Sequence, residues 1–174
     1  LGNLCEQVYS RQRRLLRSRN AVTNDSEHDP MTTSHEWFRR TTGRWTSARR
    51  YLYNLKTKKP TNLITEFTIR ACLEGDWDFS VEWSGQTAGT MNLKLTGNEL
   101  HRDIGYFTTD PTVSTISVID TDAIVLSTSY SGMNFREEIR LLNDDKLRLR
   151  QTVGYDDETG EVRIVGQYFE ERVS

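Results

Sequence analysis

The sequence predicts an all-β protein: a single ten-stranded antiparallel up-and-down β-barrel with one short helix near the N-terminus. From Gly43 onward, apolar and polar residues alternate almost throughout, and residues typical of tight turns interrupt the alternation at short intervals. A period of two is typical of strands with one dry face and one wet face, and closely spaced turns join such strands into an antiparallel meander. A sheet of this length removes its exposed edges by closing into a barrel.

The first 30 residues differ in composition from the rest of the chain. Residues 1–30 combine an arginine-rich stretch with a polar linker, whereas residues 31–174 carry the alternating pattern. A basic leader of this kind can be the remnant of an organelle-targeting segment or an amphipathic helix on the surface. We therefore expect a single barrel domain over residues 31–174.

A short helix is predicted from Thr33 to Thr42. Thr33 can cap its first turn, and Glu36 follows at the spacing of a capping box. Because an isolated helix of this length is marginally stable in water, we expect Trp37 and Phe38 to dock it on the barrel.

The ten predicted strands follow in order after this helix. The third is the clearest, since Trp77, Phe79, Val81 and Trp83 share one of its faces. A buried aromatic side chain removes about 150–250 Å² from water, so these rings indicate either the anchor of a core or the wall of a cavity for a large flat ligand. The predicted strands cover residues 45–53, 63–70, 77–83, 91–95, 100–107, 113–119, 123–130, 134–142, 147–155 and 161–173.

Composition excludes several classes of protein. The net charge of −2 gives no electrostatic reason to expect nucleic-acid binding, and no apolar run of about 18 residues occurs that could span a membrane. Cys5 and Cys72 lie far apart, which argues against a disulfide scaffold, and the sequence has no His or Cys spacing that predicts a metal site. Phosphate-binding loops and nucleophile elbows are also absent from the sequence.

Charged residues within apolar strands are the candidates for a functional site. Arg49 shares a predicted face with Tyr51, and Glu170 follows Tyr168 on the last strand. A charge buried alone costs too much free energy, so a buried arginine needs a carboxylate from the protein or from a ligand.

The inward face is ambiguous for two other segments. Simple alternation places Leu147 and Leu149 inside and the arginines that follow them, Arg148 and Arg150, outside. The adjacent residues 137 and 138 are both glutamates and have to point to opposite faces.

Several short segments, taken in order, resemble the S-type phycobiliprotein lyases of the CpcS/CpeS group. These segments are Glu36-Trp37-Phe38, Gly43-Arg44-Trp45, Ser47-Ala48-Arg49, Val81-Glu82-Trp83-Ser84-Gly85, Arg102-Asp103-Ile104-Gly105-Tyr106, Glu137-Glu138, Leu147-Arg148-Leu149-Arg150 and Glu170. The resemblance implies a ten-stranded barrel of the calycin type, similar to lipocalins and fatty-acid-binding proteins, which agrees with the strand count above.

The resemblance also implies an enzymatic function. Lyases of this group bind a linear tetrapyrrole (bilin) such as phycoerythrobilin and transfer it to a cysteine of a phycobiliprotein subunit, forming a thioether. The implied partners are the bilin and an α or β subunit of phycoerythrin or phycocyanin, with no permanently bound cofactor. The sequence does not decide whether the protein forms a homodimer. The basic leader suits a plastid protein of an alga, and the alternative location is a cyanobacterial cytoplasm.

Roles for individual residues follow from the same resemblance. Arg49 with Arg148 or Arg150 would bind the two propionates of the bilin. Val81 and Trp83, with Tyr51 or Tyr106, would line the ring-binding wall. Glu138 or Glu170 would act catalytically by forming hydrogen bonds to the pyrrole nitrogens, and the nucleophile would be a cysteine of the acceptor rather than Cys72.

Two alternatives from other functional classes remain at this point. One is a lipocalin-like carrier of a fatty acid or another apolar ligand, for which a single arginine above an aliphatic lining is expected. The other is a barrel filled by its own side chains, in which the tryptophans and tyrosines are simply core.

Overall fold

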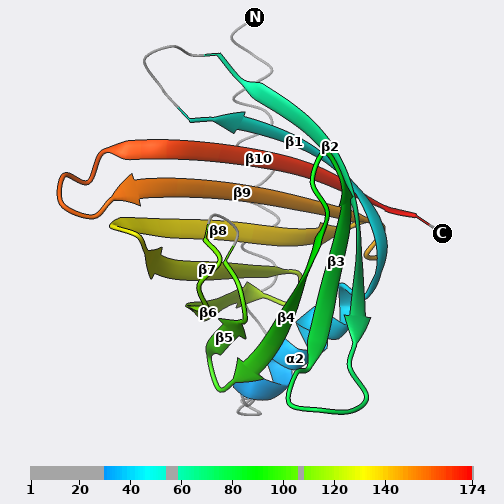
Figure 1. Cartoon of the computed structure of the whole chain (residues 1–174). Helices are drawn as coiled ribbons and strands as arrows, with labels where there is room; N and C mark the ends of the chain where they lie inside the picture. The colour runs from blue at the N-terminus through cyan, green and yellow to red at the C-terminus, as the bar shows by residue number, and fades with distance from the viewer. Residues whose placement is uncertain (1–29, 54–58, 106–107, 174) are drawn as a thin grey trace, which may run out of the picture.

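The computed structural model describes residues 30–53, 59–105 and 108–173 of the chain. These residues form a closed barrel in which each strand pairs antiparallel with its neighbours in sequence, and β1 pairs with β10 to close the ring (Figure 1). The predicted ten-stranded barrel with one short helix is therefore confirmed. Its elements are α2 (Pro30–Arg40), β1 (Gly43–Leu52), β2 (Thr61–Ala71), β3 (Phe79–Gly85), β4 (Gly89–Thr96), β5 (Glu99–Arg102), β6 (Thr112–Asp120), β7 (Ala123–Tyr130), β8 (Met133–Leu142), β9 (Leu147–Asp156) and β10 (Val162–Val173).

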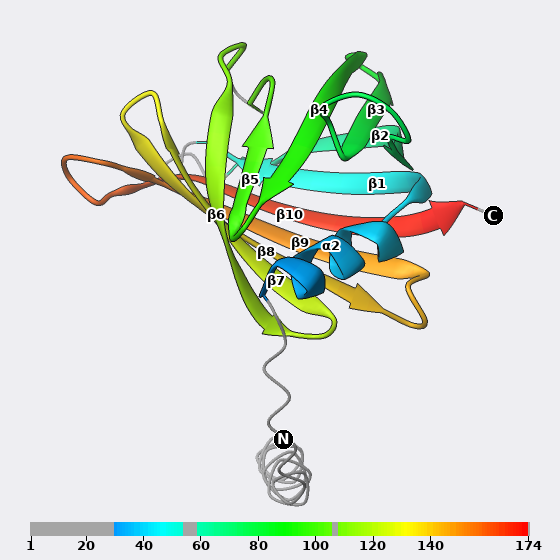
Figure 2. The same ribbon diagram turned by 90° about the horizontal axis from the view of Figure 1, so that it is seen from below.

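Helix α2 lies across one end of the barrel, as Figure 2 shows from below. Trp37 and Phe38 are buried, with their rings in an edge-to-face contact at 5.2 Å between centroids, and Phe38 contacts Phe79 of β3 at 5.8 Å. The predicted docking of the helix through these two rings is confirmed.

The C-terminal end of α2 is fastened to the barrel by Arg40. Its guanidinium donates two hydrogen bonds to Asp145, at 3.0 and 2.6 Å, and one to Asp122 at 2.7 Å. These carboxylates belong to the β8–β9 and β6–β7 turns, and Asp145 in particular raises the pKa of Arg40. Arg172 of β10 adds a hydrogen bond of 2.6 Å to the carbonyl oxygen of Arg40.

The helix begins earlier than the sequence predicted. Pro30 opens it, which suits a residue that lacks an N–H and has its φ already fixed for a first helical turn. Thr33 is thus inside the helix rather than at its N-cap, and Glu36 instead contacts Arg39 at 3.8 Å on the surface, so the predicted capping box was wrong. Of the predicted leader, residues 1–30, only Pro30 is described, and residues 1–29 lie outside the described residues.

Two predicted strands are shorter in the structure. The third begins at Phe79 rather than Trp77, because the Asp78 carboxylate accepts a hydrogen bond of 2.7 Å from the backbone N–H of Leu95. The fifth ends at Arg102, since Asp103 turns its carboxylate to the backbone N–H of Asn92 at 2.8 Å. Part of the predicted fifth strand, residues 106–107, is outside the described residues.

Within the described residues, no helix combines the length and apolar character that a membrane crossing requires.

Candidate functional site

The barrel encloses a cavity of about 200 Å³ that runs along its axis. Trp37 and Phe38 of α2 line it at one end, and Thr87 and Gly105, in loops at the opposite end of the strands, line it at the other. Between them the wall is largely apolar, but four arginines and Glu170 also line the cavity. The interior is therefore not filled by side chains.

Glu170 of β10 is the centre of a first polar cluster. It is fully buried, and the strand register places it opposite Ser47 of β1 and Arg148 of β9. Ser47 donates a hydrogen bond of 2.9 Å to one carboxylate oxygen, and the Nε of Arg148 donates to the other. Arg49 extends the cluster, since its Nε donates to the Ser47 hydroxyl at 3.1 Å.

Two aromatic rings also contact the Arg148 guanidinium. It lies 5.2 Å from the ring centroid of Trp45 and 4.9 Å from that of Phe67, which are stacked nearly parallel to each other. Cation–π contacts of this kind offset part of the cost of removing the guanidinium from water.

Glu137 of β8 is the centre of a second cluster. Its carboxylate accepts hydrogen bonds from Arg150 and, at 3.1 Å, from Thr152. Arg102 approaches the other oxygen at 3.8 Å and donates a hydrogen bond of 2.6 Å to Ser114. The Arg150 guanidinium also lies 4.6 Å from the ring centroid of Tyr168.

Both buried glutamates are held in the ionised form. Burial by itself would raise the pKa of Glu137, but the charges of Arg150 and Arg102 outweigh it, so the pKa lies below its usual value. Burial opposes ionisation of Glu170 in the same way, and Arg148 again brings the pKa below its usual value. Burial raises the pKa of Tyr168 well above its usual value, so this phenol stays neutral.

The described interior carries an excess of positive charge. Its cations are Arg49, Arg102, Arg148 and Arg150, and the carboxylates that contact them are Glu137 and Glu170. Four positive and two negative charges leave a formal excess of two. A cavity with this excess of positive charge attracts an anionic ligand, and two negative charges on the ligand would balance it.

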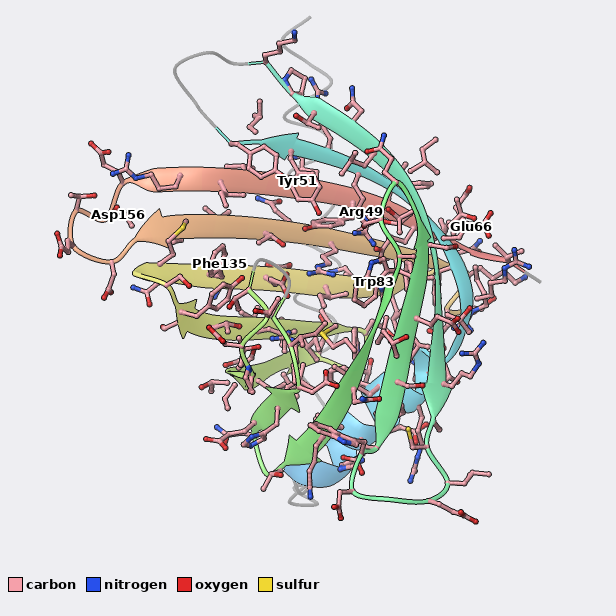
Figure 3. The ribbon with its side chains drawn as sticks, in the orientation of Figure 1. Arg49, Tyr51, Glu66, Trp83, Phe135 and Asp156 are labelled. Carbon is pink, nitrogen blue, oxygen red and sulfur yellow. The ribbon has the colours of Figure 1, made fainter. Side chains whose placement is uncertain are left out.

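Trp83 forms a flat wall of the cavity because its neighbour is a glycine. Gly89 of β4 lies directly opposite Trp83 of β3, and a Cβ atom at this position would approach the indole ring to 2.4 Å. The missing side chain lets the indole lie across the adjacent strand. Arg49 and Trp83 line the same cavity, and both point into the barrel in Figure 3.

The structure brings most of the predicted site residues to this cavity. Val81, Arg148, Arg150 and Glu170 line it together with Arg49 and Trp83. Tyr51 is buried on the same face of β1 but packs against Tyr53 and Tyr168, at 5.4 and 5.5 Å between ring centroids, and is not among the residues that line the cavity. Tyr106 lies outside the described residues.

The structure decides two inward faces that the sequence left ambiguous. Leu149 is 40% exposed on the outside of β9, and the arginines on either side of it are buried inside, because they find carboxylate partners there. Glu138, a predicted catalytic residue, lies on the outer surface 3.8 Å from Arg140, and its neighbour Glu137 takes the inward position.

Sequence reasoning assigned no role to Arg102 or Thr152. Both are buried polar residues on inward faces. For Arg102 the sequence did offer a signal: it lies two residues after Leu100 and therefore shares its face of β5, and that face is buried.

Comparisons with known proteins agree with this architecture. The family model described as "CpeS-like protein" matches residues 79–173. A protein of Nostoc sp. that carries the provisional name phycocyanobilin lyase CpcS 2 is 27% identical over 165 residues, covering 79% of this chain and 89% of the relative. A protein of Picosynechococcus sp., provisionally named chromophore lyase CpcV, is 28% identical over 169 residues, covering 82% of each chain.

Among solved structures, the S-type phycobiliprotein lyase CPES from Guillardia theta superposes with a TM-score of 0.62. The match covers 87% of this chain and 99% of that protein, at 16% identity. At this level of identity the likeness concerns the fold.

Proposed function

The chain belongs to the CpeS-like family, and from that premise we propose that it is a bilin lyase. It binds a linear tetrapyrrole such as phycoerythrobilin in its cavity and transfers it to a cysteine of a phycobiliprotein subunit. The observation that carries the proposal is the formal excess of two positive charges beside the flat indole of Trp83.

A bilin matches this charge and shape. Its two propionates supply the two missing negative charges, and its conjugated rings supply a flat surface for the indole. Arg49 is the first candidate to bind a propionate, because its described hydrogen bond goes to the Ser47 hydroxyl rather than to a carboxylate. A hydrogen bond between charged groups contributes about 1.5–3 kcal/mol. A fatty acid has one carboxylate and would leave one positive charge uncompensated.

Besides binding the bilin, the site would activate it, and the ionised carboxylate of Glu170 would do so. Glu170 lines the cavity, and its carboxylate can accept hydrogen bonds from pyrrole N–H groups. A negative charge at this point favours the protonated bilin, which makes the exocyclic ethylidene more electrophilic. Positioned proton transfer of this kind typically accelerates a reaction by about 10²–10⁴-fold.

The transfer step is an addition. A C–S bond forms between the cysteine sulfur of the acceptor and the exocyclic carbon of the ethylidene, while the thiol proton is taken up by the adjacent ring carbon. Bond changes balance without an oxidant or reductant. The protein binds the bilin in an extended form and orients it for attack, and such positioning supplies much of the rate. Cys72 is half-buried and is not among the residues that line the cavity.

Two measurements test this function. Phycoerythrobilin mixed with the purified protein is expected to give a sharpened, shifted visible absorption band, which Arg49→Ala combined with Arg148→Ala abolishes and the outward-facing control Arg50→Ala retains. Coexpression with a bilin pathway and candidate antenna subunits is expected to give covalent colour on a denaturing gel. An unchanged spectrum for the wild-type protein would rule out the proposal.

A further inference from the structure

Tyr168 of β10 lies between two of the arginines that line the cavity. The strand register places it directly opposite Arg49 of β1 on one side and directly opposite Arg150 of β9 on the other. Its ring centroid is 5.6 Å from the guanidinium carbon of Arg49 and 4.6 Å from that of Arg150. Neighbouring strands lie about 4.8 Å apart, so one aromatic ring separates two inward-facing cations across three adjacent strands.

The next row of inward residues toward α2 has a different kind of residue at its centre. It runs across the same three strands as Ser47, Glu170 and Arg148, and there the central carboxylate pairs with its arginine neighbour. Tyr168 cannot form such a pair, because burial raises the pKa of its phenol and keeps it neutral. The row centred on Tyr168 therefore holds its two guanidiniums apart without cancelling the charge of either.

Both cations beside Tyr168 belong to groups with a surplus of positive charge. Arg49 donates its described hydrogen bond to a serine hydroxyl. Arg150 shares the carboxylate of Glu137 with Arg102 in the described interior. One negative ligand group on each side of the Tyr168 ring would balance these two surpluses.

Packing fixes the position of the Tyr168 ring. The ring meets that of Tyr51 edge to face, at 5.5 Å between centroids. Gly166 lies two residues earlier on the same face of β10, and a Cβ atom there would lie 3.1 Å from both tyrosine rings. Tyr168 is not among the residues that line the cavity, whereas both of its arginine neighbours are. Its ring would therefore act on a ligand through the two arginines.

We propose that Tyr168 is a positioning residue that sets the separation of two carboxylate-binding arginines, Arg49 and Arg150. This role rests on the proposed binding of a bilin, and the ligand feature selected is a pair of carboxylates on short arms from neighbouring rings. The two propionates of a linear tetrapyrrole extend from its two central rings, which a single carbon joins. One propionate then binds on each side of the Tyr168 ring.

Binding of phycoerythrobilin and of its dimethyl ester to the full chain tests this role. The ester keeps the conjugated rings and loses both negative charges, so the ratio of the two affinities measures recognition of the carboxylates. The wild-type protein is expected to bind the diacid at least about 100-fold more tightly than the ester. Tyr168→Leu is expected to lower this ratio at least about tenfold, while its affinity for the ester stays within about threefold of the wild type.

Two control variants separate the ring from its hydroxyl and from general loss of an aromatic residue. Tyr168→Phe keeps the ring and is expected to keep the wild-type ratio. Phe169→Leu removes a ring from the outer face of the same strand and is also expected to keep it. Gly166→Ala leaves the tyrosine in place but displaces its ring through the new Cβ atom, and is expected to lower the ratio about threefold.

The role of Tyr168 is overturned if Tyr168→Leu keeps the wild-type ratio, or if it weakens binding of the diacid and of the ester equally, as a merely structural residue would. If Tyr168→Leu loses the far-UV circular dichroism spectrum of the barrel, Gly166→Ala decides by the same two criteria. A wild-type protein that binds both compounds equally well also overturns the role. A wild-type protein that binds neither compound contradicts the proposed function itself, and the role with it.

Discussion

Arg49 and Arg148 line the same cavity, but their partners differ: Arg148 is ion-paired with Glu170, whereas Arg49 donates its described hydrogen bond to the hydroxyl of Ser47. The guanidinium of Arg148 is part of the folded core, whereas that of Arg49 keeps its charge available to a ligand.

Arg49→Gln is therefore expected to weaken ligand binding without weakening the fold. The loss of one charge-assisted hydrogen bond of about 1.5–3 kcal/mol corresponds to a roughly 10- to 150-fold lower affinity for phycoerythrobilin. The free energy of unfolding should change by less than about 0.5 kcal/mol, since no buried carboxylate loses its partner. Absorbance titration and urea unfolding measure the two quantities, and equal affinity in variant and wild type would contradict the assignment.

Arg148→Gln is expected to weaken both properties. It leaves the fully buried carboxylate of Glu170 without its ion-pair partner, and breaking a buried pair in this way costs about 3–5 kcal/mol. Urea unfolding should show a lower midpoint than for Arg49→Gln. The idea is wrong if the two arginine variants are equally stable.

The adjacent glutamates of β8 offer a matched pair of substitutions. Glu137→Gln removes the charge between Arg150 and Arg102 and is expected to destabilise the fold by about 3 kcal/mol or more. Glu138→Gln alters a surface residue and should stay within about 0.5 kcal/mol of the wild type. Thermal or urea unfolding of the two variants measures this difference. The inward placement of Glu137 would be refuted if Glu138→Gln were the less stable of the two.

Stability is expected to fall in acid because of the two buried carboxylates. Their pKa values are lowered in the folded state from the ordinary value of 4.5. The unfolded chain therefore takes up protons first, so the stabilisation is fully present above about pH 4.5 and is lost as the pH falls through the folded-state values. Melting temperature measured against pH should show this decline, and Glu137→Gln should make it shallower below pH 4.5. A wild-type curve that stays flat to lower pH would contradict the prediction.

Gly89→Ala tests how Trp83 is oriented. A Cβ atom at this position would come within 2.4 Å of the indole, so the ring has to leave its place on the cavity wall. We expect a changed near-UV circular dichroism signal and weaker bilin binding, with the barrel retained by far-UV measurements. Gly97→Ala lies at a turn where a Cβ atom meets no neighbour within 4 Å but where φ is +60°, so it is expected to lower the stability through backbone strain and to leave the near-UV signal unchanged, which separates strain from contact with the indole. Identical near-UV spectra for wild type and Gly89→Ala would exclude this role of the glycine.

The strand count was predictable because it depends on local pattern. Alternation and turn residues give the same bounds as those found for β7, and they also locate β6, β8 and β10 to within one or two residues at each end. Element ends were less predictable, because they depend on contacts such as that of the Asp78 carboxylate with the backbone of β4.

The inward faces of the polar strands could not be read from the sequence alone. In Leu147-Arg148-Leu149-Arg150, hydrophobicity favours leucines inside, yet the arginines are buried because carboxylates separated from them by 22 and 13 residues in sequence face the same interior. The same non-local pairing decides between Glu137 and Glu138. Trp83 and Gly89 were both visible in the sequence, but their opposition across β3 and β4 follows from the register.

Arg40 binds the β6–β7 and β8–β9 turns through Asp122 and Asp145, and so holds α2 in place across one end of the barrel. In the described part of the chain, α2 covers one end of the cavity, so a guest molecule is expected to enter at the opposite end, which Thr87 and Gly105 line. If a bilin binds in this cavity, the molecule that delivers it and the subunit that accepts it have to approach the same end, and therefore one after the other.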